Sequence, residues 1–176
     1  MVRIRGLDDL LLGGIETHAI TEFYGGAGSG KSQLCHALAV IAAQSAKVIY
    51  VDTEGKFRPE SLVTIARSRG LDIHVTNRNW LSNILYVKAM TSYQQEFLNN
   101  SLNPLLENEE RPISLLIVDS VISNYRAEFL GSTNLAERQQ RLYRLMNLLF
   151  CIAQKYGIAV VITNQVNSSH SYGKSN

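Results

Sequence analysis

The stretch YGGAGSGKSQLCHALAV, residues 24–40, places four glycines within six positions and then runs into a lysine and a helical pattern of apolar residues. Residues 25–32 fit the pattern G-x-x-x-x-G-K-[ST] of a phosphate-binding loop. Glycines let successive backbone N–H groups turn inward around an anion, and the N-terminus of the following helix adds free amides and a positive dipole end. The stretch therefore predicts a strand, a phosphate-binding loop and a helix, in that order.

The residues of this loop have expected roles in holding a nucleoside triphosphate. We expect Lys31 to reach the β- and γ-phosphates and the Ser32 hydroxyl to ligate Mg²⁺, which prefers hard oxygen ligands. The predicted nucleotide-binding residues are Gly25, Gly26, Ala27, Gly28, Ser29, Gly30, Lys31 and Ser32. The alternative is a flexible turn between a strand and a helix. The loop's placement after a buried strand and before a helix disfavours that alternative.

Five short apolar runs rich in β-branched residues predict strands at residues 18–24, 47–52, 84–90, 113–119 and 157–163. Most are nearly continuous in apolar residues, which is typical of strands buried on both faces. Helical patterns lie between them at residues 31–44, 59–69, 92–107 and 134–156. Ser92 is the expected N-cap of the third helix, and Gly157 is the expected stop of the last. This alternation predicts an α/β fold with a mostly parallel sheet and helices on both faces.

Polar side chains follow three of the predicted strands. Asp119 ends the run ISLLIVD in the context of a magnesium-site aspartate, although apolar strands also often end in a capping aspartate. The carboxyl ends of parallel strands converge on one crevice, so we expect Glu54 to act as general base and Gln165 to contact the γ-phosphate. A solvated turn glutamate and a capping Asn-Gln pair are the alternatives. The predicted catalytic residues are Glu54, Lys31 and Gln165, and the predicted magnesium ligands are Ser32 and Asp119.

The composition of the 176-residue chain is that of an ordinary globular protein, with 45% hydrophobic and 18% charged residues. The net charge is +2, so a nucleic-acid surface must be a local patch. No stretch approaches the ~20 apolar residues of a membrane span, and the N-terminus does not have the pattern of a signal peptide. We expect an intracellular soluble protein with Cys35 and Cys151 as buried reduced thiols. The four histidines lack metal-ligand spacing and are expected in structural or surface roles.

Seven segments of the sequence carry a resemblance to a known family: GGIETHAITEFYG, the glycine loop, VDTEGKFRPE, LLIVDS, YRAEFLG, LAERQQ and VITNQV. In this order, and over essentially the whole chain, they resemble the archaeal RadA and eukaryotic recombinase branch of the RecA family. The resemblance implies a RecA-like P-loop ATPase core that binds ATP and Mg²⁺ between neighbouring subunits on single-stranded DNA. It also implies strand exchange in DNA recombination and repair, and a cytoplasmic, nucleoid-associated location. Glu54 matches the catalytic glutamate, and Gln165 matches the γ-phosphate sensor that leads into the second DNA-binding loop.

The chain departs from the family pattern at two places. Ser61 stands where the family motif FRPER has an arginine that stacks on adenine, and loss of that planar cation is expected to weaken nucleotide binding or loosen base preference. Ser132 stands where the first DNA-binding loop reads GRG. The resemblance implies a core at residues 1–165 and the polar start of the second DNA-binding loop at residues 166–176. The chain begins at the core and ends inside that loop, so a fragment and a degenerate paralogue both remain open.

The expected DNA-binding residues are Arg126, Gly131, Ser132 and Lys174. Arg126 matches a DNA-contacting arginine of the family, although a local ion pair with Glu128 or Glu137 would also account for it. Lys174 lies in the polar tail with Tyr172, where the pair could follow a phosphate backbone and stack a base. The tail is therefore the second expected DNA contact.

Three functions remain open from the sequence. The first is a DNA-dependent ATPase that self-associates on single-stranded DNA and promotes strand exchange. The second is an accessory module that binds ATP, hydrolyses it weakly or not at all, and associates with a full-length recombinase. Ser61 and Ser132, which replace arginines of the family motifs, favour this function. The third is a RecA-like signalling ATPase with no DNA partner. No membrane partner is expected.

Overall fold

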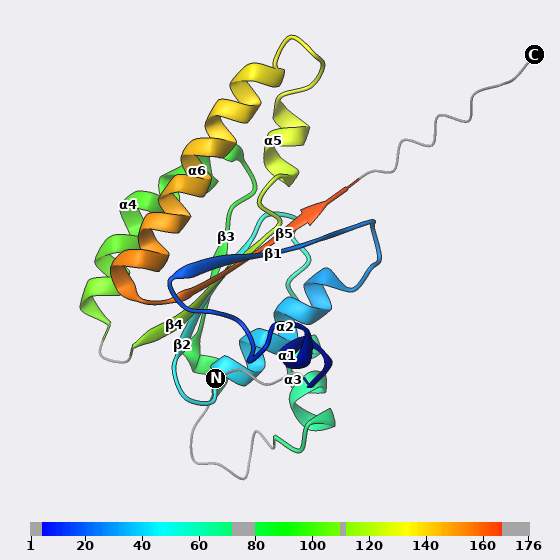
Figure 1. The fold of residues 1–176 in the computed structure, drawn as a ribbon, viewed down its shortest axis with the longest axis vertical. Coiled ribbons are helices and arrows are strands. Elements are labelled where there is room, and N and C mark those ends of the chain that lie inside the picture. Colours follow the sequence, from blue (N-terminus) through cyan, green and yellow to red (C-terminus); the bar gives the residue numbers. More distant parts are fainter. Residues whose placement is uncertain (1–4, 72–79, 110–111, 167–176) are drawn as a thin grey trace, which may run out of the picture.

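The computed structural model describes residues 5–71, 80–109 and 112–166. Its strands form one five-stranded sheet in the order β1-β5-β4-β2-β3 (Figure 1). These strands are β1 (Ala19–Gly25), β2 (Lys47–Asp52), β3 (Ile84–Lys88), β4 (Ile113–Asp119) and β5 (Ala159–Gln165). All four pairings of neighbouring strands are parallel. The first and last strands of the chain are neighbours, with Ala19 opposite Ala159 and Gly25 opposite Gln165.

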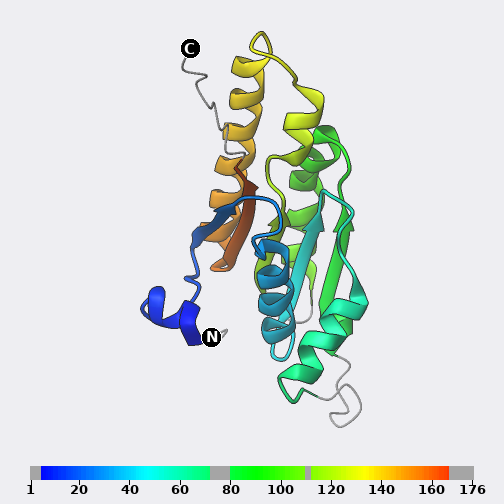
Figure 2. The same cartoon turned by 90° about the vertical axis from the view of Figure 1, so that its right-hand side faces the viewer.

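Helices cover both faces of this sheet. One face carries α2 (Lys31–Ala42) and α3 (Pro59–Ser68), which lie on the near side of the sheet in Figure 2. The other face carries α4 (Ser92–Asn108), the short α5 (Ser123–Glu128) and the long α6 (Leu135–Tyr156). Two further short elements are α1 (Arg5–Leu10) and the 3-10 helix η1 (Trp80–Asn83). The prediction of an α/β fold with a parallel sheet and helices on both faces is confirmed.

Alternate residues of the central strands supply the two cores. In β2, Ile49 and Val51 belong to the core under α4 and α6, whereas Val48 and Tyr50 belong to the core under α2 and α3. Leu116 and Leu115 of β4 divide between the two cores in the same way. Because both faces are buried, both sets of residues are apolar, and this is the physical reason for the continuous apolar runs in the sequence.

Several predicted boundaries and burial states were wrong. The strand predicted at 157–163 begins only at Ala159, because Gly157 adopts a left-handed conformation (φ 64°) that caps α6. The N-cap of α4 is Thr91 and not Ser92, since the Thr91 hydroxyl accepts a hydrogen bond from the Gln94 N–H at 3.1 Å. Cys151 is exposed, whereas Cys35 is buried as expected, and both are free thiols.

The strand predicted at 84–90 ends at Lys88, and the helices α1 and α5 were not predicted. Both helices have six residues, which is too short for an apolar period to show in the sequence. Within the three described ranges, no helix is long and apolar enough to cross a membrane.

Candidate nucleotide-binding site

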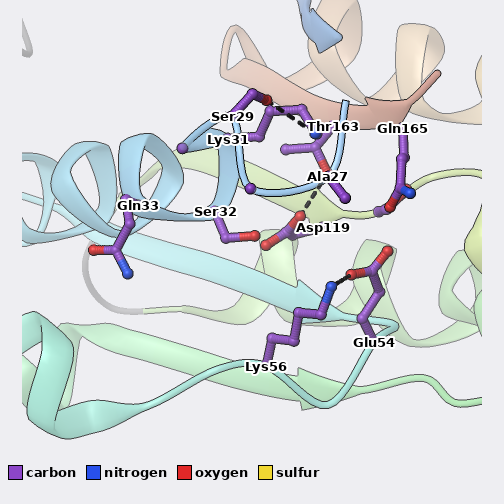
Figure 3. Close-up of a pocket in the computed structure, with 13 residues that line it drawn as sticks. Ala27, Ser29, Lys31, Ser32, Gln33, Glu54, Lys56, Asp119, Thr163 and Gln165 are labelled. Carbon is purple, nitrogen blue, oxygen red and sulfur yellow. Dashed lines mark hydrogen bonds and ion pairs between the residues drawn. The ribbon is translucent and has the colours of Figure 1, made fainter. Parts of the chain in front are cut away.

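The glycine loop and the carboxyl ends of β2, β4 and β5 meet around one cavity of about 240 Å³ (Figure 3). The loop contributes Ala27, Gly28, Ser29, Gly30, Lys31 and Ser32. The strand ends contribute Glu54, Asp119 and Gln165. The structure therefore brings together every predicted catalytic residue and both predicted magnesium ligands. This is the arrangement expected where the ends of parallel strands face a helix N-terminus.

The glycine loop has the backbone conformation for which its composition is suited. Gly28 (φ 74°) and Gly30 (φ 89°) both lie in the left-handed region, where a side chain would be strained. Gly30 is also the N-cap of α2, so the helix begins at Lys31 with its free amides at the cavity. The loop and the helix start together form a site suited to an anion.

The Lys31 ammonium lies inside the concavity of this loop. Its Nζ donates to the Gly25 carbonyl at 2.9 Å, to the Gly26 carbonyl at 2.7 Å and to the Ser29 hydroxyl at 3.2 Å. The ammonium group is thus bound by the loop itself, close to the backbone amides that start α2. A phosphate group placed here would meet both a positive charge and hydrogen-bond donors.

Asp119 is a buried carboxylate at the end of β4. It accepts hydrogen bonds from the Tyr50 hydroxyl at 3.0 Å and from the Thr163 hydroxyl at 2.5 Å. Burial, followed by the charge of Asp119, raises the pKa of Tyr50, so the phenol stays a donor. The carboxylate is therefore held in place from the neighbouring strands β2 and β5.

The oxygen ligands in the cavity fit Mg²⁺ bound together with phosphates. Ser32 supplies a hydroxyl and Asp119 a carboxylate, and both line the same cavity. In the part of the chain that the structure describes, no group of three or more His, Cys, Asp or Glu side chains could hold a metal ion alone. Mg²⁺ typically binds one or two protein oxygens and completes its shell with phosphate and water, which agrees with this small ligand set.

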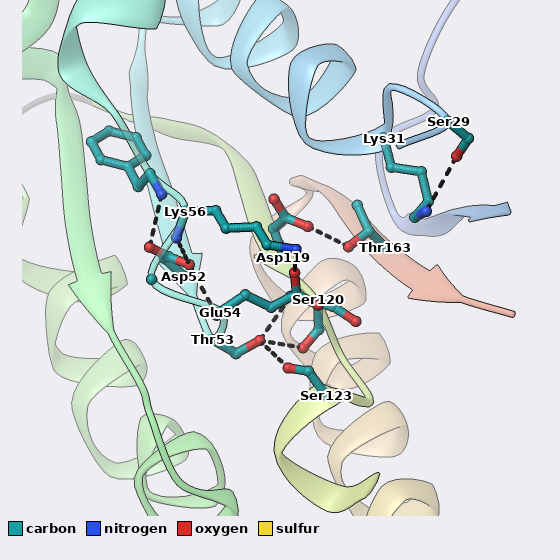
Figure 4. Close-up of polar contacts among 12 residues, drawn as sticks. Ser29, Lys31, Asp52, Thr53, Glu54, Lys56, Asp119, Ser120, Ser123 and Thr163 are labelled. Carbon is teal, nitrogen blue, oxygen red and sulfur yellow. Dashed lines mark hydrogen bonds and ion pairs between the residues drawn. The ribbon is translucent and has the colours of Figure 1, made fainter. Parts of the chain in front are cut away.

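Asp52, at the end of β2, organises the loop that carries Glu54 (Figure 4). One carboxylate oxygen accepts from the backbone N–H groups of Glu54 (3.0 Å) and Lys56 (3.2 Å). The other accepts from the Phe57 N–H at 3.0 Å and from the Tyr86 hydroxyl at 3.3 Å. Asp52 is 1% exposed, so these donors satisfy a carboxylate that is almost fully out of water. Aspartates often accept hydrogen bonds from the backbone of the turn that follows them. The sequence analysis did not predict this role for Asp52.

Thr53 fixes the loop after β2 against the end of β4. Its hydroxyl donates to the Ser120 carbonyl at 2.7 Å and accepts from the Ser120 N–H at 2.8 Å, and its N–H donates to the Asp119 carbonyl at 2.9 Å. The same hydroxyl lies 2.7 Å from the Ser123 hydroxyl at the start of α5. Glu54 and Asp119 therefore sit on two chain segments that are joined immediately behind the cavity.

Lys56 is a residue of the cavity that the sequence analysis missed. Its ammonium forms an ion pair with the Glu54 carboxylate, and Figure 3 shows this pair facing the glycine loop. The hydrogen bond to Glu54 is the largest cause that raises the pKa of Lys56, with smaller contributions from Glu54, Asp119 and Asp52 charges. A basic residue two positions after the expected catalytic glutamate was the signal that could have revealed it.

One comparison with known proteins identifies the family. The family model named Rad51 matches residues 2–175 of the chain. The chain belongs to the Rad51 family. Rad51-family proteins are recombinases that bind single-stranded DNA and oligomerise, and they generally bind ATP with Mg²⁺. Membership supports a role of this chain in DNA recombination and repair.

Arg126 of this Rad51-family chain contacts the end of β5. Its guanidinium donates a hydrogen bond to the backbone carbonyl of Gln165, at the end of β5. The two carboxylates proposed as alternative partners are otherwise engaged: Glu128 accepts from Ser92, and Glu137 accepts from Arg141 at 3.1 Å. Arg126 thus links α5 to the strand end that carries the predicted γ-phosphate sensor.

Two other DNA-binding positions predicted for this Rad51-family chain, Gly131 and Ser132, do not line the cavity. Gly131 and Ser132 are exposed in the turn between α5 and α6. Lys174, with most of the tail at residues 166–176, lies outside the described residues.

Ser61 is half-buried in the first turn of α3, where its N–H donates to the Arg58 carbonyl at 3.0 Å. Ser61 is not among the residues that line the cavity.

Proposed function

We propose that this Rad51-family chain is a DNA-stimulated ATPase of homologous recombination and repair. The observation that carries the proposal is the convergence of the glycine loop, Glu54, Asp119 and Gln165 on one cavity. This set contains a cation for phosphates, oxygen ligands for Mg²⁺, a carboxylate for the attacking water and an amide for the terminal phosphate. Phosphoryl transfer needs little beyond such positioning and charge stabilisation.

Hydrolysis would use these residues in distinct roles. Lys31 and the amides of the loop bind the β- and γ-phosphates, while Ser32 and Asp119 hold Mg²⁺, which neutralises phosphate charge when bound. Glu54 accepts a proton from the water that attacks the γ-phosphorus, and the bond from that phosphorus to the β–γ bridging oxygen breaks to give ADP and phosphate. Gln165 contacts the γ-phosphate and responds to its loss.

The DNA side of the proposal begins at Gln165. The chain continues from this residue into the tail, and Arg126 ties its carbonyl to α5, which leads into the turn at Gly131 and Ser132. A change at the γ-phosphate can therefore reach both predicted DNA contacts through one residue. Assembly of several copies on single-stranded DNA and strand exchange, in a cytoplasmic, nucleoid-associated setting, are part of the same proposal.

The test is ATP hydrolysis by the purified chain with and without single-stranded DNA. We expect DNA to stimulate turnover, and Lys31→Ala to lower it by about 10²-fold or more. Lys155→Ala is the matched control, because Lys155 lies on α6 outside the cavity and pairs with Glu107. Absence of turnover in the wild-type chain, or turnover untouched by Lys31→Ala, would contradict the proposal.

A second candidate is an accessory module that binds nucleotide and associates with a full-length recombinase. It is favoured by the exposed turn at Ser132, where no cation replaces the arginine of the family motif, and by Ser61 in place of the adenine-stacking arginine. This candidate predicts ATP binding with negligible hydrolysis and co-purification with a full-length recombinase. Failure to retain that partner in a pull-down would count against it.

A further inference from the structure

Lys56 is a second lysine at the triphosphate cavity, on the side opposite the glycine loop. It projects from the loop after β2, whereas Lys31 projects from the start of α2. Figure 3 shows the Lys56 ammonium reaching toward the Glu54 carboxylate beneath the glycine loop. The cavity therefore has a cation on each side, and only Lys31 belongs to the phosphate-loop motif.

The backbone holds Glu54 and Lys56 as a unit. The N–H groups of both residues donate to the same Asp52 oxygen, at 3.0 Å and 3.2 Å. Since the backbone is anchored at both positions, a change of partner by Lys56 needs only side-chain rotation. The loop itself can stay in place.

The two members of this ion pair differ in freedom. The Lys56 side chain is 61% exposed, whereas the Glu54 side chain is 18% exposed. The half-buried Glu54 carboxylate shares a cavity with Asp119 and is stabilised by a counter-charge, whereas the long lysine stem can reach other partners. Lys56 is thus the more exposed partner, with more room to rotate, and Glu54 is the more buried one.

We propose that Lys56 is a second phosphate-binding cation. When a nucleoside triphosphate binds, the Lys56 ammonium breaks its ion pair with Glu54 and pairs with the terminal phosphate. The terminal phosphate is a stronger anion than one carboxylate, so it competes for the ammonium. The exchange frees both Glu54 oxygens to accept a proton from water. A diphosphate has no terminal group at this position and leaves the ion pair intact. The inference rests on the proposed function, because it assigns a role at the same triphosphate site.

The pair formed by Lys155 and Glu107 shows why position decides this role. It is also a lysine–glutamate pair, with a 2.9 Å separation and both side chains more than half exposed. It lies outside the cavity, on the surface of α6 and α4. The two lysines are therefore matched in chemistry and differ in access to a phosphate.

The experiment measures the affinity of the full chain for ADP and for the non-hydrolysable β,γ-imido analogue of ATP, both with Mg²⁺. We expect Lys56→Met to weaken binding of the triphosphate analogue about tenfold and to leave ADP affinity within about twofold. Lys56→Arg keeps the charge and should keep most of the affinity. Lys155→Met should change neither nucleotide. Circular dichroism and thermal unfolding verify that each variant is folded.

A second background separates phosphate binding from simple neutralisation of Glu54. In Glu54→Gln the carboxylate charge is gone, so a lysine that only neutralises it has no remaining effect on affinity. We expect Lys56→Met to weaken triphosphate binding about tenfold in this background as well. If Lys56→Met weakens triphosphate binding only when Glu54 is present, or weakens ADP binding equally, Lys56 is not a second phosphate-binding cation. Either result leaves the proposed function standing. A wild-type chain that binds neither nucleotide overturns both.

Discussion

The candidate nucleotide-binding cavity and the turn between α5 and α6 differ in how their side chains are held. In the cavity, the Asp119 carboxylate has hydrogen-bond donors from two other strands, and Asp52 fixes the loop that carries Glu54. In the turn, Gly131 and Ser132 are both exposed. The first region is held by hydrogen bonds within the protein, whereas the second offers backbone and a small hydroxyl to the solvent.

This difference separates two kinds of function. A preorganised cavity can supply catalysis, because its charges need no rearrangement as the reaction proceeds. An exposed turn can supply affinity for a flexible polyanion, and its contribution depends on the cations it carries. We therefore expect substitutions in the cavity to change rates strongly and substitutions in the turn to change DNA affinity modestly.

The largest effect is expected at Glu54. Glu54→Gln removes the proposed general base with little change in volume, so ATP turnover should fall roughly 10²- to 10⁴-fold while triphosphate binding is retained. Steady-state hydrolysis together with nucleotide titration measures both quantities. Glu107→Gln, at the exposed pair with Lys155, is the control and should leave turnover unchanged. Equal turnover in the two variants would remove Glu54 from the reaction.

Asp52 tests whether the cavity depends on its buried support. Asp52→Ala leaves three backbone N–H groups and the Tyr86 hydroxyl without their acceptor. We expect the free energy of unfolding in urea to fall by about 3 kcal/mol, and turnover to fall with it. Asp52→Asn keeps one acceptor oxygen and should lose less. A stability unchanged in Asp52→Ala would show that the loop holds its shape without the carboxylate.

Arg126 tests the connection between the two regions. Because its guanidinium bonds to the Gln165 carbonyl, Arg126→Gln should lower DNA-stimulated turnover about fivefold. The slope of DNA affinity against salt concentration should stay the same, since the guanidinium is bonded to the Gln165 carbonyl. Arg67→Gln, on the exposed face of α3, is the control. A salt slope for single-stranded DNA reduced by about 0.7 would instead assign Arg126 to a phosphate of DNA.

Ser132 should give the smallest effect. Ser132→Arg adds one cation to the exposed turn, so affinity for single-stranded DNA should rise several-fold at low salt, with a salt dependence steeper by about 0.7. Nucleotide affinity should not change. Ser132→Gln controls for side-chain length without charge. An equal gain in both variants would mean that contact area, and not charge, limits DNA binding at this turn.

The parts of the molecule that could be predicted from sequence are those fixed by the sheet. Strands buried on both faces give continuous apolar runs, and parallel pairing then forces Glu54, Asp119 and Gln165 to one edge. Lys56 was missed because no periodicity determines where a side chain in an irregular loop points. The cap at Thr91 was missed by one residue, because adjacent threonine and serine both suit an N-cap. Cys151 is exposed because it lies off the face of α6 that Leu145, Leu149, Ile152 and Ala153 bury.

The adjacency of β1 and β5 has a consequence for the order of synthesis and folding. Gly25, at the start of the glycine loop, pairs with Gln165, near the other end of the described chain. Contacts of such sequence separation form late, because a long loop must close before they contribute. In a ribosome-bound chain, the cavity between the glycine loop and the strand ends can therefore form only after β5 has emerged and inserted between β1 and β4. Nucleotide binding by a nascent chain would then report that β5 has paired with β1 and β4.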